Sequence, residues 1–312
     1  MLTWFSPSEV PAEFGPSAVT IGKFDGVHAG HRAVIEQLRT VAADRGLAAT
    51  VVTFDRHPLS LLRPELCPEA LVSQQQKLEL LEGAGVEATL TLTFDRAFSE
   101  MPAEQFILSV LVESLHAKVV LVGSDFRFGA RGAGNVELLR EVGQVHGFDV
   151  VVIDDVAPEG ERRVSSTWVR ELLSEGRVDA AADLLGGPHT IRAVVVHGEQ
   201  RGRTMGYPTA NLSPAIEGFI PADGVYAAWL TVDGTRYAAA VSIGNNPTFE
   251  GVPEKQVEAH ALDQNLDLYD RTVEVSFVRY VRGMQKFPGM DALVEQMHAD
   301  ELEVRTVLGL SQ

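Results

Sequence analysis

The chain has 312 residues, which is long enough for two domains that each have their own hydrophobic core. Hydrophobic residues make up 45% and charged residues 22%, as is typical of soluble globular proteins, and no segment is long and apolar enough to cross a membrane. The net charge of −17 argues against nucleic-acid binding through a broad basic surface. A single cysteine, Cys67, excludes an intramolecular disulfide and a multi-cysteine metal site. The N-terminus has no signal-peptide pattern, and we expect a cytoplasmic protein.

The first half of the sequence alternates short apolar runs with helical patterns. The apolar runs predict strands over 17–24, 48–54, 89–94, 118–123 and 148–154. Spacing of about 3.6 residues predicts helices over 31–45, 74–81, 104–116 and 135–145. Repeated strand-helix units favour an α/β domain with a Rossmann-like parallel sheet, whose ligands bind at the carboxyl ends of the strands.

A break follows two short helical patterns over 166–174 and 178–185. Gly186-Gly187-Pro188 interrupts the chain there, and we predict domains at 1–186 and 187–312. Beyond the break, apolar runs predict strands over 191–196, 224–232, 237–243, 257–262 and 272–280. Turn residues separate these strands, which indicates an antiparallel β-barrel, and a last helical pattern covers 291–308.

Two histidines lie three residues apart where the first-half strand 17–24 gives way to a helix. His28 and His31 belong to a segment whose glycines let the backbone turn tightly. At a helix start, unpaired N–H groups and the positive end of the helix dipole add to the imidazoles, which predicts a phosphate site. The spacing matches the nucleotidyltransferase signature H-x-G-H. The alternative is an ordinary strand-turn-helix corner. The other predicted phosphate-binding residues of this segment are Gly22, Phe24, Asp25 and Gly30.

Two further polar clusters are expected at the same edge of the sheet. The segment 123–129 contains Asp125 and follows an apolar strand, so it could contact a base or ribose, or its phenylalanines could simply pack under the loop. Hydroxyls and arginines converge at a predicted helix start over 162–170 and could bind phosphate, or could form a plain helix cap. The predicted phosphate ligands in this second cluster are Ser165, Ser166, Thr167 and Arg170.

These segments, together with 53–58, resemble the flavin nucleotidyltransferase module of bacterial bifunctional riboflavin kinase/FMN adenylyltransferases, also called FAD synthetases. The resemblance implies that His28 and His31 polarise ATP phosphates, and that Ser166, Thr167 and Arg170 hold the leaving pyrophosphate. It also implies flavin contacts from Phe54, His57 and Asp125. Many relatives carry asparagine at position 125 and proline at position 56, where this chain has Asp125 and Arg56.

A glycine-rich loop opens the second half. The segment 197–211 leaves an apolar strand and can approach phosphates closely, although it lacks the P-loop pattern. Thr209 offers a hydroxyl and Asn211 an amide oxygen, of the kind that Mg²⁺ accepts beside substrate phosphates. Taken alone, Pro-Thr-Ala-Asn could be an ordinary turn. The predicted phosphate-binding residues of this loop are Gly202, Arg203, Gly206, Pro208, Thr209 and Asn211.

Glu258 stands in a predicted strand whose alternation separates Val257 and Ala259 from Glu258 and His260. A carboxylate there could accept a proton from a substrate hydroxyl that attacks a γ-phosphate, or could be an exposed barrel residue. With 206–211, 242–248 and 266–269, this strand resembles riboflavin kinases in order and spacing. The resemblance implies a six-stranded flavokinase barrel, Thr209 and Asn211 as Mg-ATP ligands, and flavin contacts from Asn211 and Glu258. Tyr207 replaces the phenylalanine of many relatives.

The sequence therefore predicts a two-step transferase. The second half phosphorylates riboflavin to FMN with Mg-ATP, Glu258 acting as base, and the first half transfers AMP from ATP to FMN without a covalent enzyme intermediate. Its partners are small molecules (ATP, riboflavin and FMN), with no nucleic acid and no membrane, and homo-oligomers are left open. One alternative is a riboflavin kinase whose first half binds nucleotide without catalysis. Another is a tRNA-handling protein, which the acidic charge disfavours.

Overall fold

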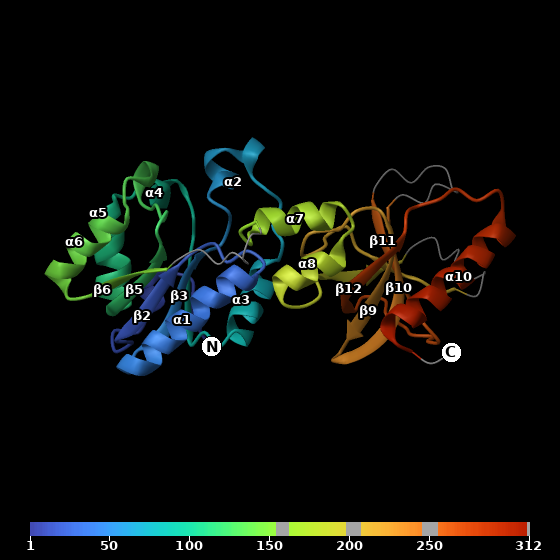
Figure 1. Cartoon of the computed structure of the whole chain (residues 1–312), viewed down its shortest axis with the longest axis horizontal. Coiled ribbons are helices and arrows are strands. Elements are labelled where there is room, and N and C mark those ends of the chain that lie inside the picture. The colour runs from blue at the N-terminus through green and yellow to red at the C-terminus, as the bar shows by residue number, and fades with distance from the viewer. Residues whose placement is uncertain (154–161, 198–206, 245–254, 311–312) are drawn as a thin grey trace. The chain divides into compact units, whose positions relative to one another are not determined.

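The structure, a computed structural model, describes residues 1–153, 162–197, 207–244 and 255–310. The chain divides into two compact units, Met1–Ser165 and Ser166–Gln312 (Figure 1). The first unit is α/β and the second is built around a β-barrel, so the predicted fold class is confirmed. None of the helices in the described ranges is both long and apolar enough to span a membrane.

The first unit contains a six-stranded sheet in the order β1-β4-β3-β2-β5-β6. All neighbouring pairs are parallel, so the carboxyl ends of the strands lie along one edge. That edge is where an open α/β sheet presents its ligand-binding loops. The strands are β1 (Leu2–Trp4), β2 (Ser17–Ile21), β3 (Ala48–Phe54), β4 (Ala88–Leu92), β5 (Ala117–Gly123) and β6 (Asp149–Ile153).

Helices connect these strands, and several carry strong capping signals. Ser73 caps α3 through a capping box with Gln76, and the Asn135 side chain accepts a hydrogen bond from Leu138 N at the start of α6. The α-helices are α1 (Ala29–Arg45), α2 (Leu59–Leu62), α3 (Gln74–Gly83), α4 (Arg96–Ser99), α5 (Ala103–Phe106) and α6 (Val136–His146). Short 3-10 turns are η1 (Pro7–Glu9), η2 (Pro64–Leu66) and η4 (Ala130–Gly132), and η3 (Ile107–Ser114) is a π-helix.

Hydrophobic side chains alternate between the two faces of this sheet. On β5, Val119 and Leu121 pack with residues of α1 and α3, whereas Val120 and Val122 pack with residues of η3 and α6. The period of two follows from the strand pleat. Since both faces are covered by helices, the inner strands β2 and β4 are entirely buried, and the loops at the carboxyl ends of the strands are the parts left to bind ligands.

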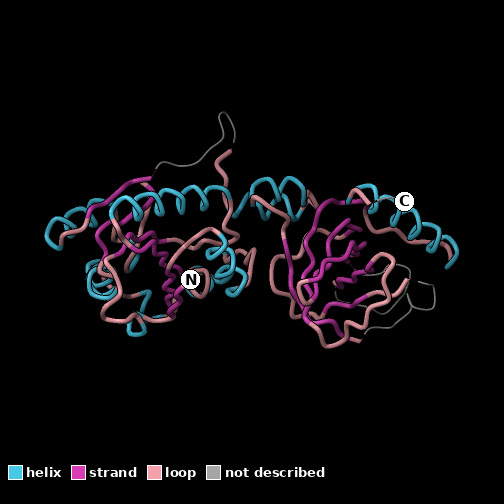
Figure 2. Tube along the Cα trace, turned by 90° about the horizontal axis from the view of Figure 1, so that it is seen from below, coloured by secondary structure: helices cyan, strands magenta, loops and turns pink. Residues whose placement is uncertain are grey.

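The second unit is organised around a closed barrel in the order β10-β11-β8-β7-β12-β9, whose neighbouring strands are antiparallel (Figure 2). The strands are β7 (Thr190–Val196), β8 (Ala210–Leu212), β9 (Gly224–Val232), β10 (Thr235–Gly244), β11 (Gln256–Ala261) and β12 (Thr272–Arg282). Three helices accompany them, α7 (Ser166–Ser174), α8 (Val178–Leu185) and α10 (Met290–Leu308). Closure leaves no open sheet edge in the barrel.

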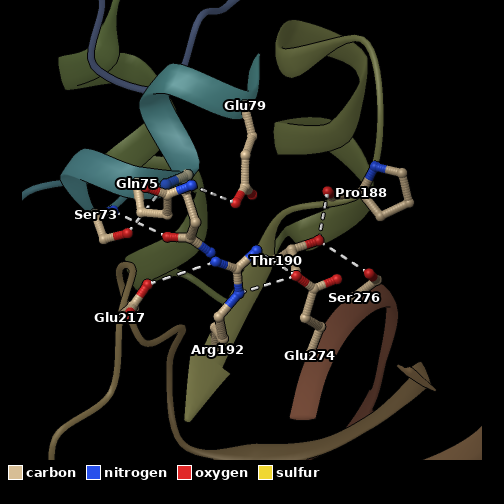
Figure 3. A network of polar contacts seen from close by, with 10 residues as sticks. Ser73, Gln75, Glu79, Pro188, Thr190, Arg192, Glu217, Glu274 and Ser276 are labelled. Carbon is tan, nitrogen blue, oxygen red and sulfur yellow. Dashed lines mark hydrogen bonds and ion pairs between the residues drawn. The ribbon is translucent and has the colours of Figure 1, made fainter. Parts of the chain in front are cut away.

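Polar side chains fasten β7 to β12 and to the loop after β8. The Arg192 Nε donates to Oε1 of Glu274 at 2.9 Å, and the hydroxyls of Thr190 and Ser276 lie 2.9 Å apart (Figure 3). Backbone hydrogen bonds in both directions join Arg192 to Glu217. These contacts hold the connection from β8 to β9 against the barrel wall.

Helix α10 packs on the outside of the barrel. Val304 is fully buried against Ala227 and Leu262. A two-pronged ion pair reinforces the contact, because the Arg282 guanidinium donates to both carboxylate oxygens of Asp300, at 2.7 and 2.6 Å. The turn directly after β11, which carries Leu262, is therefore packed against this helix.

One predicted strand is shorter in the structure, and one strand of the structure was not predicted. The first strand was predicted over 17–24 but ends at Ile21, because Phe24 has φ +50°, which a strand does not accept. Strand β8 overlaps the end of the Pro-Thr-Ala-Asn segment. Its three residues are too few to show the alternation of apolar and polar side chains that indicates a strand. The helix predicted over 104–116 is present, with most of it wound as the π-helix η3.

Candidate functional site

The loop between β2 and α1 has an unusual backbone. Phe24, Gly26 and Val27 all have positive φ, at +50°, +80° and +41°. Glycine accepts such angles freely, but a β-branched valine does so only under strain, and here Val27 is completely buried. The surrounding packing therefore fixes this loop in one shape, and the chain enters α1 directly behind it.

His28 and His31 come together at the start of α1. His28 occupies the N-cap position, and its ring stacks on that of His31 with centroids 3.8 Å apart and planes 19° apart. The Phe24 ring lies tilted against that of His31, with centroids 5.0 Å apart. A Cβ on Gly30 would meet the His28 ring at 3.3 Å, so glycine leaves room for this stack. The predicted pairing of the two imidazoles at a helix start agrees with this geometry.

The surroundings of His31 favour an uncharged ring. Burial, helped by the charges of His28, Lys23 and Arg163, lowers the pKa of His31 well below its usual 6.5. Its Nδ1 is buried and has no hydrogen-bond partner within the described ranges. The neighbouring cations and the positive end of α1 would instead favour an anion beside the rings.

Asp25, predicted to bind phosphate, has a structural contact. Its Oδ1 accepts a hydrogen bond from the backbone N–H of Leu71 at 2.9 Å, which ties the loop after β2 to the segment before α3. Gly22 is close to the Phe24 ring, since an added Cβ would meet that ring at 3.0 Å. A role for either residue toward phosphate stays a prediction.

A buried lysine that the sequence reading missed lies at the same edge. Lys77 on α3 donates from Nζ to the carbonyl of Phe54 at 2.6 Å, and burial lowers its pKa to about 8 against the opposing charges of Asp25 and Asp55. Asp55 in turn accepts a hydrogen bond from Phe94 N. A lysine in an amphipathic helix reads as a surface residue, so no local pattern distinguishes it.

Aromatic residues and arginines line a cavity of about 700 Å³ at the ends of β4 and β5. Phe94, Phe98 and Phe106 lie on its wall together with Arg63 and Arg96. Phe54, a predicted flavin contact, packs edge to face with Phe94 at 5.8 Å and tilted with Phe98 at 5.9 Å. Aromatic faces with nearby guanidinium groups suit a flat aromatic ligand that carries negative charge. The sequence carries a sign of this cavity in Phe94 and Phe98, which lie four residues apart just after β4.

The loop after β5 combines packing with polar contacts. Phe128 is buried and stacks on Phe126 at 5.3 Å, which agrees with the packing alternative for these two side chains. Asp125 is exposed, and its Oδ2 lies 3.5 Å from the guanidinium of Arg163. Since Arg163 also influences His31, it joins two predicted binding segments, although the sequence reading did not select it.

The predicted hydroxyl cluster straddles the division between the two units. Ser165 ends the first unit, whereas Ser166 and Thr167 begin α7, which also carries Arg170, in the second. Hydroxyls in the first turn of a helix suit an anion. Their contact with phosphate stays a prediction.

In the barrel, Thr209, Asn211 and Glu258 come together across two strands. Asn211 on β8 pairs with Glu258 on β11, and the Thr209 hydroxyl donates to Oε2 of Glu258 at 3.2 Å. Glu258 is half-buried, while Val257 and Ala259 on either side are fully buried. The predicted alternation is thus present, and three oxygen-bearing side chains converge. Three other predicted residues, Gly202, Arg203 and Gly206, lie outside the described residues.

A second cavity, of about 320 Å³, adjoins this group. Pro208 and Thr209 line it on one side, and Leu266 and Tyr269 line it on the other. His260, which the sequence reading did not select, fixes the Pro208 end, because its Nδ1 lies 2.8 Å from the Pro208 carbonyl and must donate to it. Polar and apolar residues both line this cavity, among them Thr209, Asn265 and Leu268.

Each half of the chain matches the model of a known protein family. The FAD synthetase family model matches residues 10–168, and the riboflavin kinase family model matches residues 185–308. A curated bifunctional riboflavin kinase/FMN adenylyltransferase of Escherichia coli K12 is 39% identical over 98% of this chain and 96% of its own length. One from Listeria monocytogenes is 34% identical over 92% and 91% of the two chains.

A solved structure gives the same fold. The crystal structure of a Streptococcus pneumoniae protein described as a macrolide-efflux protein superposes with a TM-score of 0.85 at 32% identity, covering 97% of this chain and 98% of that one. The sequence relatives span both units in the same order as the two family models. The chain belongs to the family of bifunctional riboflavin kinase/FMN adenylyltransferases.

Proposed function

We propose that this chain makes FAD from riboflavin in two steps, each using ATP. The C-terminal domain, 187–312, phosphorylates riboflavin to FMN, and the N-terminal domain, 1–186, adenylylates FMN and releases pyrophosphate. The observation that carries the proposal is the convergence of Thr209, Asn211 and Glu258 in a barrel, on a chain that also stacks His28 on His31 at a helix start. Family membership supports both activities.

In the kinase step, Glu258 acts as the general base. Its carboxylate accepts the proton of the ribityl 5′-hydroxyl as that oxygen attacks the γ-phosphorus of ATP. The hydrogen bond from Thr209 orients the carboxylate before the substrate arrives. Because Thr209 and Asn211 offer hard oxygen atoms beside Glu258, they fit Mg²⁺, which would neutralise phosphate charge when bound.

In the adenylylation step, His28 and His31 stabilise charge on the α-phosphate of ATP. An oxygen of the FMN phosphate attacks the α-phosphorus directly while pyrophosphate leaves, and no enzyme nucleophile takes part. Ser165, Ser166, Thr167 and Arg170 are proposed to hold the pyrophosphate.

The flavin of this second step is proposed to occupy the cavity lined by Phe94, Phe98 and Phe106. The isoalloxazine ring is flat and aromatic, so it can stack on these faces, with Phe54 supporting them from behind. His57 follows β3 and Asp125 follows β5, the two strands on either side of β2, and both residues are proposed to contact the flavin from the carboxyl edge of the sheet. The partners are thus ATP and flavins, and the cytoplasmic location stays a prediction of the sequence.

Purified protein incubated with riboflavin, ATP and Mg²⁺ tests both steps at once. Chromatography of the products should show FMN first and FAD later, and the same protein supplied with FMN and ATP should form FAD directly. If no FMN appears, the kinase assignment is wrong. FMN without any FAD would instead favour a kinase whose N-terminal half binds nucleotide without catalysis.

A further inference from the structure

Lys23 lies where the phosphate-binding loop of the first unit meets the loop after β3. Its Nζ is 3.1 Å from Nε2 of His57, and its own carbonyl accepts a hydrogen bond from the Thr53 hydroxyl at 3.2 Å. Since β2 and β3 are parallel neighbours, both residues stand at the carboxyl edge of the sheet. The Lys23 side chain is exposed, so a ligand can reach it.

The contact between Lys23 and His57 brings two hydrogen-bond donors together. The backbone N–H of Leu59 donates to Nδ1 of His57 at 3.1 Å, which leaves the proton of a neutral ring on Nε2. A protonated lysine side chain can donate hydrogen bonds but cannot accept them. An oxygen anion that accepts from Nζ and from Nε2 at once is therefore the ligand chemistry that suits this pair.

Lys23 belongs to the same loop between β2 and α1 that leads into the histidine pair. Its charge is one of the causes, after burial and His28, that keep His31 neutral. An anion held between Lys23 and His57 would thus lie beside the proposed site of the ATP phosphates. Two anionic groups that must react with each other repel, and a lysine between them reduces that repulsion.

We propose that Lys23 and His57 bind the phosphate of FMN and that Lys23 is a catalytic residue of adenylylation; this rests on the function proposed above. A bond forms between an oxygen of the FMN phosphate and the α-phosphorus of ATP. The bond from that phosphorus to the bridging oxygen breaks, and its electron pair leaves with pyrophosphate. Lys23 stays protonated throughout and screens the approach of the two phosphates.

The test separates recognition of the phosphate from recognition of the flavin ring. We expect Lys23→Met to raise the KM for FMN about tenfold or more, the effect of losing one charge-assisted hydrogen bond. Lumiflavin, which has the ring without the ribityl phosphate, should inhibit the variant and the wild type with the same inhibition constant. Lys23→Arg should restore most of the activity, and Lys118→Met, at an exposed lysine on β5, should change neither value.

Each outcome decides one question. An unchanged KM for FMN in Lys23→Met overturns the inference, as does an equal loss of FMN and lumiflavin affinity, which would indicate a distorted loop. Riboflavin phosphorylation by the same variant is the internal control and should match the wild type. If wild-type protein forms no FAD from FMN and ATP, the proposed function fails and not this inference alone.

Discussion

The Thr209 hydroxyl donates to Oε2 of Glu258 across 49 residues of sequence, at 3.2 Å. The carboxylate proposed as the base of the kinase step is thus held by a residue that is distant in sequence but lies beside it in the closed barrel. A carboxylate in a fixed rotamer loses less freedom when the substrate hydroxyl arrives.

Replacing this base should abolish one activity and leave the other. We expect Glu258→Gln to lower the rate of FMN formation by about a hundredfold or more, the usual contribution of a general base. FAD formation from supplied FMN should stay at the wild-type rate. Glu274→Gln, a carboxylate on another barrel strand, is the matched control, and a similar loss in both variants would contradict the assignment.

The two imidazoles should give the opposite result. His28→Ala and His31→Ala should each lower FAD formation from FMN by about a hundredfold, since groups that stabilise charge in the transition state contribute on that scale. Riboflavin phosphorylation by the same proteins should be unchanged. His146→Ala, at the exposed end of α6, controls for loss of any histidine. Equal loss of both activities would refute the division of labour between domains.

Gly30 makes a sharper test of the histidine geometry. A methyl group at this position would meet the His28 ring at 3.3 Å, so the ring would have to shift by a few tenths of an ångström in its stack on His31. We expect Gly30→Ala to lower adenylylation roughly ten- to a hundredfold, because small displacements of a catalytic group have effects of this size. Gly83→Ala, whose added methyl group meets nothing within 4 Å, should keep full activity in steady-state assays of FAD formation.

Lys77 predicts a particular pH dependence of stability. Its pKa is lowered to about 8 in the folded unit, against about 10.4 in an unfolded chain. Between these values the unfolded chain holds a proton that the folded unit lacks, so the free energy of unfolding rises with pH by about 1.4 kcal/mol per unit. Below pH 8 both states hold the proton and this contribution is constant.

Denaturant unfolding at pH 8 and pH 10 measures this effect. The increase attributable to Lys77 should be present in wild-type protein and absent in Lys77→Met, while Lys118→Met, at an exposed lysine, should retain it. An identical pH dependence in all three proteins would show that burial does not shift Lys77.

Much of the fold follows from local pattern. Continuous apolar runs such as 48–54 and 118–123 predict buried strands because both faces of a parallel sheet are covered, and those strands are found as β3 and β5. Strand β8 could not be predicted, because its three residues are held by pairing with β7 and β11 and not by their own preference.

The candidate sites divide in the same way. His28 and His31 are close in sequence, so a short motif is enough to predict that their rings meet. Lys23 and Lys77 take their chemistry from residues on other segments, His57 for the first and the Phe54 carbonyl for the second. Such long-range contacts cannot be predicted from the residues next to either lysine in the sequence.

The pairing of β1 with β4 has a consequence for synthesis on the ribosome. Leu2–Trp4 is made early, yet the one strand that pairs with it in the described part of the chain is Ala88–Leu92, so this edge of the sheet stays open until more than eighty further residues have emerged. Trp4, the last residue of β1, is buried in the folded unit. During translation the β1–β4 edge can therefore form only after β4 has emerged, whereas β5 and β6 of the same sheet and all strands of the barrel are made later still.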